Sequence, residues 1–180
     1  MTVRRERSTP RSTVAALARL GLAAIAALSL TSMAFGQTTG KVTTVWKCAA
    51  PNPVNAVPVG DTPDHVYVVQ QGKCSAASGE IAGVKQKEGM PTEFVDAAGA
   101  TAKGHGIFIE TMANGDKIIY AYDFTGTSRN KMFESGTNTF MATSGTGRFA
   151  GIKSNGTCQA KGHPDGSTEF TCNGTYTLPK

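Results

Sequence analysis

Short runs of β-branched and aromatic residues, separated by Gly, Thr and Asn, fill the chain from residue 41 to residue 178, and helix signals are almost absent. This alternation of strand-forming runs and turn residues is typical of an all-β protein. Residues 49–63 contain four prolines and are predicted to form a long extended loop. The predicted strands are 41–46, 65–71, 79–85, 92–96, 106–113, 116–124, 138–143, 152–161 and 167–178.

About eight antiparallel strands with short connections must hide their edges, and closing the sheet into a barrel removes those edges. We therefore predict an all-β fold, a single antiparallel up-and-down, calycin-like barrel of about eight strands with two disulfides. At this strand number the interior is either filled by side chains or wide enough for one small ligand.

The Asn114-Gly115 pair between two strand-like runs is the strongest local signal. It predicts a two-residue type I′ hairpin, in which both central residues have positive φ. The resulting register pairs Thr111 with Ile118, Ile109 with Tyr120, Ile107 with Tyr122 and His105 with Phe124. Because this face is the apolar one, we expect it to point into the core.

Four cysteines remain after the leader, and an even number is typical of disulfides in an exported protein. Three pairings are possible. We predict Cys48 with Cys74 and Cys158 with Cys172, since the second pair flanks a hairpin around residues 162–166. If Lys161 opposes Glu169 in that hairpin, Cys158 falls opposite Cys172.

Residues 1–36 have the pattern of a signal peptide: arginines, then an apolar run from Leu20 to Leu30, then small residues. The apolar run is too short for a permanent membrane span, which takes about 20 residues. The leader holds five Arg and one Glu, so the remaining chain has 13 basic and 12 acidic residues, a net charge of +1. We therefore expect a periplasmic or secreted domain at 37–180, with no nucleic-acid partner and no membrane association after cleavage.

A glycine-rich corner, Ser144-Gly-Thr-Gly-Arg-Phe-Ala-Gly-Ile152, precedes the closing strands, in which Gly156-Thr157 and Gly174-Thr175-Tyr176 follow. This segment resembles the end of the allene oxide cyclase and dirigent-like barrels. The whole mature chain is also similar to a group of small secreted bacterial proteins with no assigned activity. They share Trp-x-Cys near the start, an Asn-Gly-Asp-Lys hairpin and a Thr-Cys…Cys-x-Gly-x-Tyr-Thr-Leu ending. The resemblance implies a barrel and carries over no functional residue, because one fold hosts many activities.

Four residues of the central hairpin are the predicted ligand-binding set: His105, Tyr120, Tyr122 and Phe124. They would form an aromatic cluster with polar tips at the barrel mouth. An ordinary packed core is the alternative interpretation of the same residues. Glu110 and Asp123 are offset along their strands and are expected to face solvent.

No catalytic motif is present. The chain has no Gly-x-Ser-x-Gly elbow, and its glycine corner lacks the Lys and the helix of a phosphate loop. It has no Cys-x-x-Cys pair or His spacing typical of a zinc site, so we expect no catalytic residue, metal or cofactor.

Three functions fit this pattern. The first is a noncatalytic exported barrel that binds a small apolar or aromatic ligand. The others are a cyclase- or dirigent-like enzyme that steers a reactive intermediate, and a structural envelope protein. The sequence leaves the oligomeric state open.

The leader generates the first prediction. Small residues precede Phe35 and Gln37 at the positions that signal peptidase reads, so N-terminal sequencing of exported protein should start at one of these two residues. Recovery of exported chains that still begin at Met1 would refute the assignment.

Overall fold

The computed structural model describes residues 37–129 and 131–180, so the predicted leader lies outside the described residues. The described chain is an antiparallel β structure with one 3₁₀ turn, η1 (Gly147–Phe149), which confirms the predicted all-β class. Its strands are β1 (Thr38–Cys48), β2 (Val54–Pro58), β3 (His65–Gln71), β4 (Cys74–Ser78), β5 (Glu80–Ile81), β6 (Val84–Ala98), β7 (Thr101–Met112), β8 (Lys117–Arg129), β9 (Met132–Gly145), β10 (Lys153–Gly162) and β11 (Thr168–Leu178). No helix in this part of the chain is long and apolar enough to cross a membrane.

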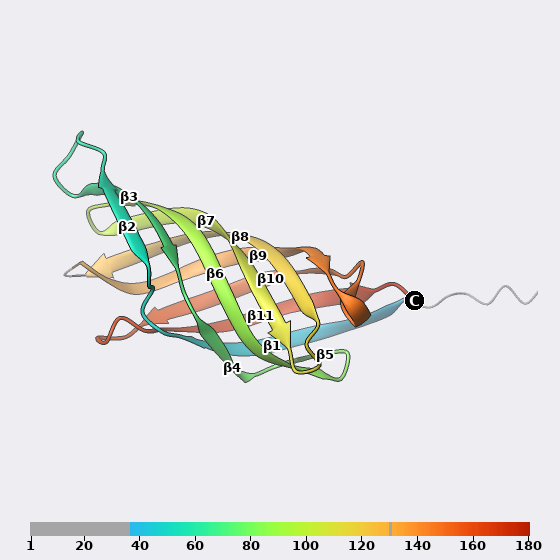
Figure 1. The fold of residues 1–180 in the computed structure, drawn as a ribbon. Coiled ribbons are helices and arrows are strands. Elements are labelled where there is room, and N and C mark those ends of the chain that lie inside the picture. The colour runs from blue at the N-terminus through green and yellow to red at the C-terminus, as the bar shows by residue number, and fades with distance from the viewer. Residues whose placement is uncertain (1–36, 130) are drawn as a thin grey trace, which may run out of the picture. The chain divides into compact units, whose positions relative to one another are not determined.

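Eight strands close into a ring in the order β6, β4, β1, β11, β10, β9, β8, β7 and back to β6 (Figure 1). Two strands share one side of β6, because β4 pairs with Glu88 and Gly89 and β3 pairs with residues 92–98. The predicted up-and-down barrel is therefore confirmed.

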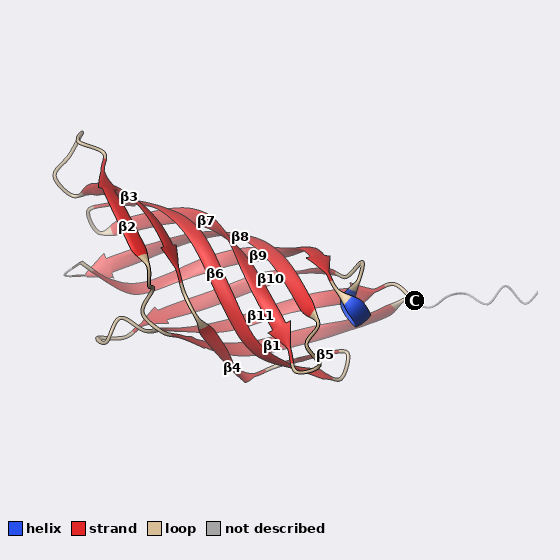
Figure 2. Ribbon diagram, viewed as in Figure 1, coloured by secondary structure: helices blue, strands red, loops and turns tan. Residues whose placement is uncertain are grey.

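The proline-rich segment 49–63 differs from its predicted loop, because β2 forms within it and pairs with β3. Proline is tolerated there because β2 is an edge strand, where a missing N–H breaks no ladder bond on the outer side. The β2–β3 hairpin extends from one end of the barrel (Figure 2).

The two ends of the barrel differ. At the end that holds β5 and η1, buried apolar side chains fill the interior; we call it the plugged end, and its largest residues are Ile81, Met112, Ile118 and Phe149. At the other end lie the β2–β3 hairpin and the β8–β9 and β10–β11 turns (Figure 1). We call this end the mouth.

Both disulfides are as predicted. Cys48 is bonded to Cys74, joining β1 to β4, and Cys158 is bonded to Cys172, joining β10 to β11. Lys161 opposes Glu169, as the register argument required. The half-cystines and Trp46 form one buried cluster on the inside of the wall.

The predicted register of the central hairpin is wrong by one residue. Ile118 opposes Glu110 instead of Thr111, and the loop between β7 and β8 has three residues instead of two. Only Gly115 in this loop has positive φ, whereas a type I′ turn needs two such residues. Asp116 explains the difference, because its backbone N–H donates to Asn114 Oδ1 and its carboxylate accepts from Asn114 Nδ2.

This one-residue shift in register exchanges the inward-facing and outward-facing residues of β7. Phe108, Glu110 and Met112 now face inward, while His105 and Ile107 face outward. Glu110 is 1% exposed, so the expectation that it faces solvent is wrong, whereas Asp123 is exposed as expected. The β8 half of the prediction holds, since Ile118, Tyr120 and Tyr122 are buried.

Several inward-facing rings lie directly on glycines of the neighbouring strands. A Cβ placed on Gly106 would lie 2.6 Å from Tyr122 Cζ, and one on Gly89 would lie 2.0 Å from Phe108 Cζ. The further pairs are Gly104 with Phe124, Gly156 and Gly174 with Phe140, and Gly40 with Tyr176. Because these glycines have no side chain, each ring can lie against the wall. Around the cavity, this leaves the interior open.

Gly106→Ala tests this arrangement. The new methyl group would meet both the Tyr122 ring and the backbone oxygen of Thr92, so we expect a loss of about 1–3 kcal/mol in the free energy of unfolding. In a strand without such contacts the same change stabilises.

Denaturant titration measures the effect of Gly106→Ala. Thr139→Ala, on the exposed outer face of β9, is the control and should stay within about 0.5 kcal/mol of wild type. A neutral or stabilising Gly106→Ala would show that the ring does not rest on this glycine.

Candidate functional site

An aromatic-walled cavity of about 480 Å³ occupies the barrel interior and reaches the mouth. This volume suits one small molecule. Three of the four predicted ligand-binding residues, Tyr120, Tyr122 and Phe124, line it, as strand β8 alternates inward and outward. The other rings in its wall are Trp46, Phe108, Phe133, Phe140 and Phe170.

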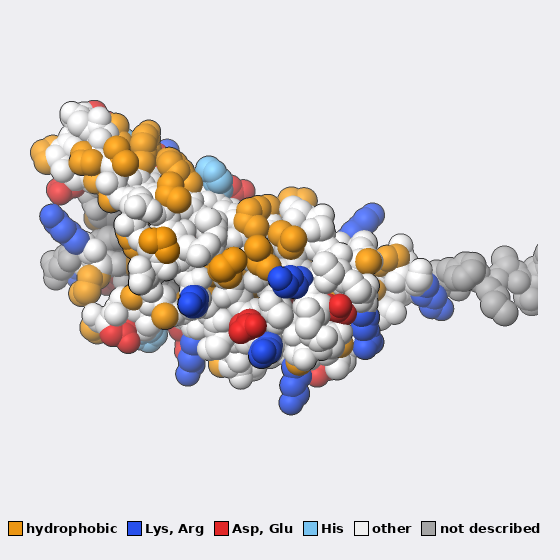
Figure 3. Space-filling model, viewed as in Figure 1, with side chains coloured by type: hydrophobic (Ala, Val, Ile, Leu, Met, Phe, Trp, Pro, Cys, Tyr) orange, Lys and Arg blue, Asp and Glu red, His pale blue; other side chains and the backbone are white. Residues whose placement is uncertain are grey.

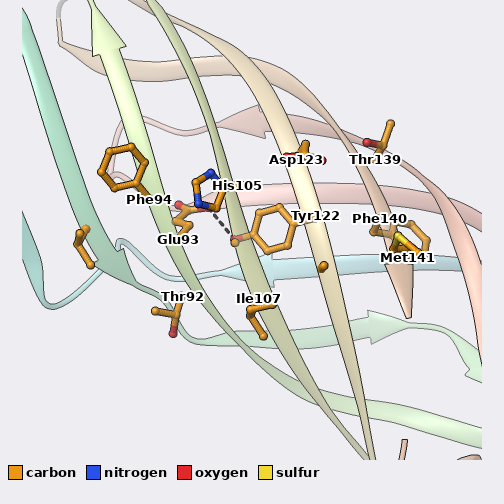
Figure 4. A pocket seen from close by; sticks show the side chains of 13 residues that line it. Thr92, Glu93, Phe94, His105, Ile107, Tyr122, Asp123, Thr139, Phe140 and Met141 are labelled. Atoms are coloured by element: carbon orange, nitrogen blue, oxygen red, sulfur yellow. Dashed lines mark hydrogen bonds between the residues drawn. The ribbon is translucent and has the colours of Figure 1, made fainter. Parts of the chain in front are cut away.

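The fourth predicted residue, His105, lies on the outer face, because the true register turns it away from Tyr120 and Tyr122. It lines a shallow groove of about 710 Å³ across β3, β6, β7, β8 and β9 (Figure 4). The apolar walls of this groove are open to solvent: Ile107 is 42% exposed and Met141 is 59% exposed. Apolar side chains are also visible on the outer surface in Figure 3. The groove is therefore less enclosed than the cavity.

Glu110 lies within the cavity wall towards the plugged end. Thr44 on β1 donates its hydroxyl to Gln86 Oε1, which leaves the amide of Gln86 free to face Glu110. Burial raises the pKa of Glu110 to about 7, and hydrogen bonding to Gln86 and Tyr120 offsets part of that rise. The carboxyl thus changes protonation state near neutral pH.

Two acceptor oxygens in the cavity wall have no hydrogen-bond partner among the described residues: Glu110 Oε1 and Asn138 Oδ1. A buried polar atom without a partner costs about 1–3 kcal/mol. Such atoms are satisfied when a bound molecule or water brings a donor. A ligand that donates a hydrogen bond could be held at either of these oxygens.

Glu93 and Tyr122 form a second polar contact in the wall, shown by the dashed line in Figure 4. Tyr122 donates its hydroxyl to Glu93 Oε2 at 2.7 Å, and Gln70 Nε2 donates to Glu93 Oε1 at 2.6 Å. Burial, together with the neighbouring Glu93 carboxylate, raises the pKa of Tyr122, so its hydroxyl stays protonated. Burial likewise raises the pKa of Tyr120, helped by Glu110. Both tyrosines therefore serve as neutral hydrogen-bonding groups.

The described residues contain no group of three or more His, Cys, Asp and Glu side chains placed to hold a metal ion. All four cysteines are in disulfides and none is a free nucleophile. What the cavity offers is flat aromatic surface with a few acceptor oxygens. This arrangement can bind and orient a small organic molecule.

Sequence reasoning missed Glu110 and Asn138 as site residues. The one-residue register error placed Glu110 on the wrong face. The alternation of β9 could have placed Asn138 beside Phe140 on the inner face, because residues two apart point the same way. The glycines that oppose aromatic residues were a further signal of which positions face inward.

No family model matches the chain, and no curated protein matches it. Two solved structures are similar in fold, both pterocarpan synthase dirigent proteins. The first is 12% identical with a TM-score of 0.43, covering 85% of this chain and 96% of that chain. The second is 8% identical with a TM-score of 0.44, covering 79% of this chain and 96% of that chain. Similarity at this level says nothing about activity, and the resemblance to allene oxide cyclases and to secreted bacterial proteins stays a prediction.

Glu110→Gln should change how stability depends on pH. The pKa of Glu110 is about 7 in the folded chain and 4.5 at its ordinary value. Its contribution to the free energy of unfolding is therefore fully present below pH 4.5 and is lost as the pH rises through 7. The loss amounts to about 3 kcal/mol in wild type, and the glutamine variant lacks it.

Denaturant titrations at several pH values between acid and mildly alkaline conditions measure this difference. Glu80→Gln, at an exposed carboxyl, is the control and should follow the wild-type profile. Parallel profiles for wild type and Glu110→Gln would mean that Glu110 keeps an ordinary pKa.

Proposed function

We propose that this protein is a noncatalytic exported barrel that binds a small apolar or aromatic molecule inside the barrel. The observation that carries the proposal is the aromatic cavity of about 480 Å³ that reaches the mouth. Glycine–ring pairs along the wall keep it open, and two disulfides brace the wall around it. Tyr120, Tyr122 and Phe124 would contact the ligand.

The disulfides also support the localisation. They persist in oxidising compartments, which fits a protein that leaves the cytoplasm. We propose a periplasmic or secreted site of action, in line with the predicted leader.

The interior cavity is a better ligand site than the outer groove. The ring of strands surrounds it and it opens at the mouth, so a bound molecule would be shielded from water more than in the outer groove. It also holds unpartnered acceptors, which give a ligand a fixed orientation. The outer groove has apolar walls that remain about half exposed.

A cyclase- or dirigent-like enzyme is the second candidate. The observation that favours it is Glu110, a buried carboxyl that can carry a proton near neutral pH inside the same cavity. Binding is nevertheless the common requirement of both functions and is tested first.

Trp46 makes binding directly measurable. It is the chain's single tryptophan, is 6% exposed and lines the cavity. N-phenyl-1-naphthylamine, a neutral aromatic probe that fluoresces in apolar surroundings, should bind, accept energy from Trp46 and show saturable emission.

Two variants locate the probe. Ala102→Phe places a ring on the inner face near the mouth and should weaken binding about tenfold or more by blocking the cavity. Ile107→Asp in the outer groove should leave binding unchanged. The opposite pattern, or no saturable emission in wild type, would overturn the proposal.

A further inference from the structure

We propose that the ligand carries an organic ammonium group, which docks on Glu110 while its apolar or aromatic body fills the rest of the cavity. This inference rests on the proposed function and names the chemical class of the ligand. It follows from three independent features of the cavity: its charge, the unpartnered oxygen of Glu110 and the rings around the carboxyl.

The charge of the cavity is the first feature. Among the described residues that line it, Glu93 and Glu110 are acidic, while Lys131 and His163 are basic. Both basic residues lie in turns at the mouth. Arg129, two residues before Lys131, lies eleven positions along β8 from Ile118, which opposes Glu110, and this is roughly 36 Å of strand. Among the described residues that line the cavity, no cation therefore lies beside Glu110.

A buried carboxylate without a cation is costly, because its attraction to water is lost and nothing replaces it. Glu93 does not share this problem, since it accepts hydrogen bonds from both Tyr122 and Gln70. A ligand cation is the missing partner of Glu110.

The unpartnered oxygen of Glu110 is the second feature. Glu110 Oε1 is an acceptor, so the group that meets it must donate a hydrogen bond. Asn138 opposes Phe124, six residues along β8 from Ile118 and so roughly 20 Å away, and its Oδ1 is no part of this contact. An ammonium group has donors and no acceptor, and it adds a charge that strengthens its hydrogen bond to a carboxylate.

The rings around the carboxyl are the third feature. Tyr120 contacts Glu110, and Phe108 lies two residues from it on the same face of β7. Trp46 packs edge-on against Phe108 with ring centroids 5.0 Å apart, and Phe140 packs edge-on against Tyr120 at 5.5 Å. Aromatic faces attract cations, and carboxylate with aromatic walls is a common way to bind ammonium.

The protonation of Glu110 agrees with this arrangement. In the unliganded barrel, burial raises its pKa to about 7, and an adjacent ammonium would lower it again. The groups that face the carboxyl are Gln86 from β6 and Tyr120 from β8, and Tyr120 stays neutral. A neutral ligand with a hydroxyl group is the alternative, because its O–H also donates a hydrogen bond.

Two competitors of matched shape distinguish an ammonium ligand from a neutral one. Phenethylamine and phenethyl alcohol have the same shape and differ in the charge of the donor. At mildly alkaline pH the ammonium form should displace N-phenyl-1-naphthylamine from wild type at about tenfold lower concentration than the alcohol. In Glu110→Gln, which keeps the size of the side chain, this preference should disappear while the naphthylamine still binds.

Asp123→Asn is the charge control. Its carboxylate is exposed on the outer face, so the preference for the amine should persist. Equal displacement by both competitors in wild type, or an amine preference that survives Glu110→Gln, would overturn the ammonium assignment and leave cavity binding standing. Absence of naphthylamine binding would instead defeat the proposed function itself.

Discussion

The contact between inward-facing rings and the glycines beside them is the constraint on which the rest of this barrel depends. An eight-stranded barrel is only just wide enough for its interior to be filled by side chains. Where Tyr122, Phe124 and Phe140 lie on Gly106, Gly104 and Gly156, the rings cover the wall instead of projecting across the interior. The cavity therefore exists because small and large residues alternate between neighbouring strands.

A buried polar side chain such as that of Glu110 lowers the stability of the fold, so its position points to a role other than stability. Glu110 lies close to the apolar plug formed by Ile81, Met112 and Phe149, where a hydrophobic side chain would pack without penalty. Two disulfides, which each contribute about 3 kcal/mol in the chain-entropy model, can offset such a penalty. A carboxyl held in an unfavourable place by a braced scaffold is the pattern expected of a functional group.

Sequence patterns predicted those parts of the fold that local chemistry determines. The Cys158–Cys172 pairing followed from the turn around Pro164, because the turn sets which residues oppose each other. The same reasoning gave a wrong register at Asn114-Gly115. There the side chain of Asp116 accepts a hydrogen bond from Asn114, and the turn is a three-residue loop. One residue of slip exchanges the faces of a strand, so the error moved His105 into the predicted site and Glu110 out of it.

The two acidic residues of the cavity lie apart along the strands. Glu110 opposes Gly89 and Glu93 opposes Gly106, so four residues of strand, roughly 13 Å, separate them. For comparison, the two catalytic carboxyl groups of glycoside hydrolases lie about 5–10 Å apart. Glu93 also accepts from Tyr122 and Gln70, which commits both of its oxygens to the wall. Glu93 is therefore not available as a second free carboxylate for Glu110, and this agrees with the proposed role of Glu110 as a site for a cation.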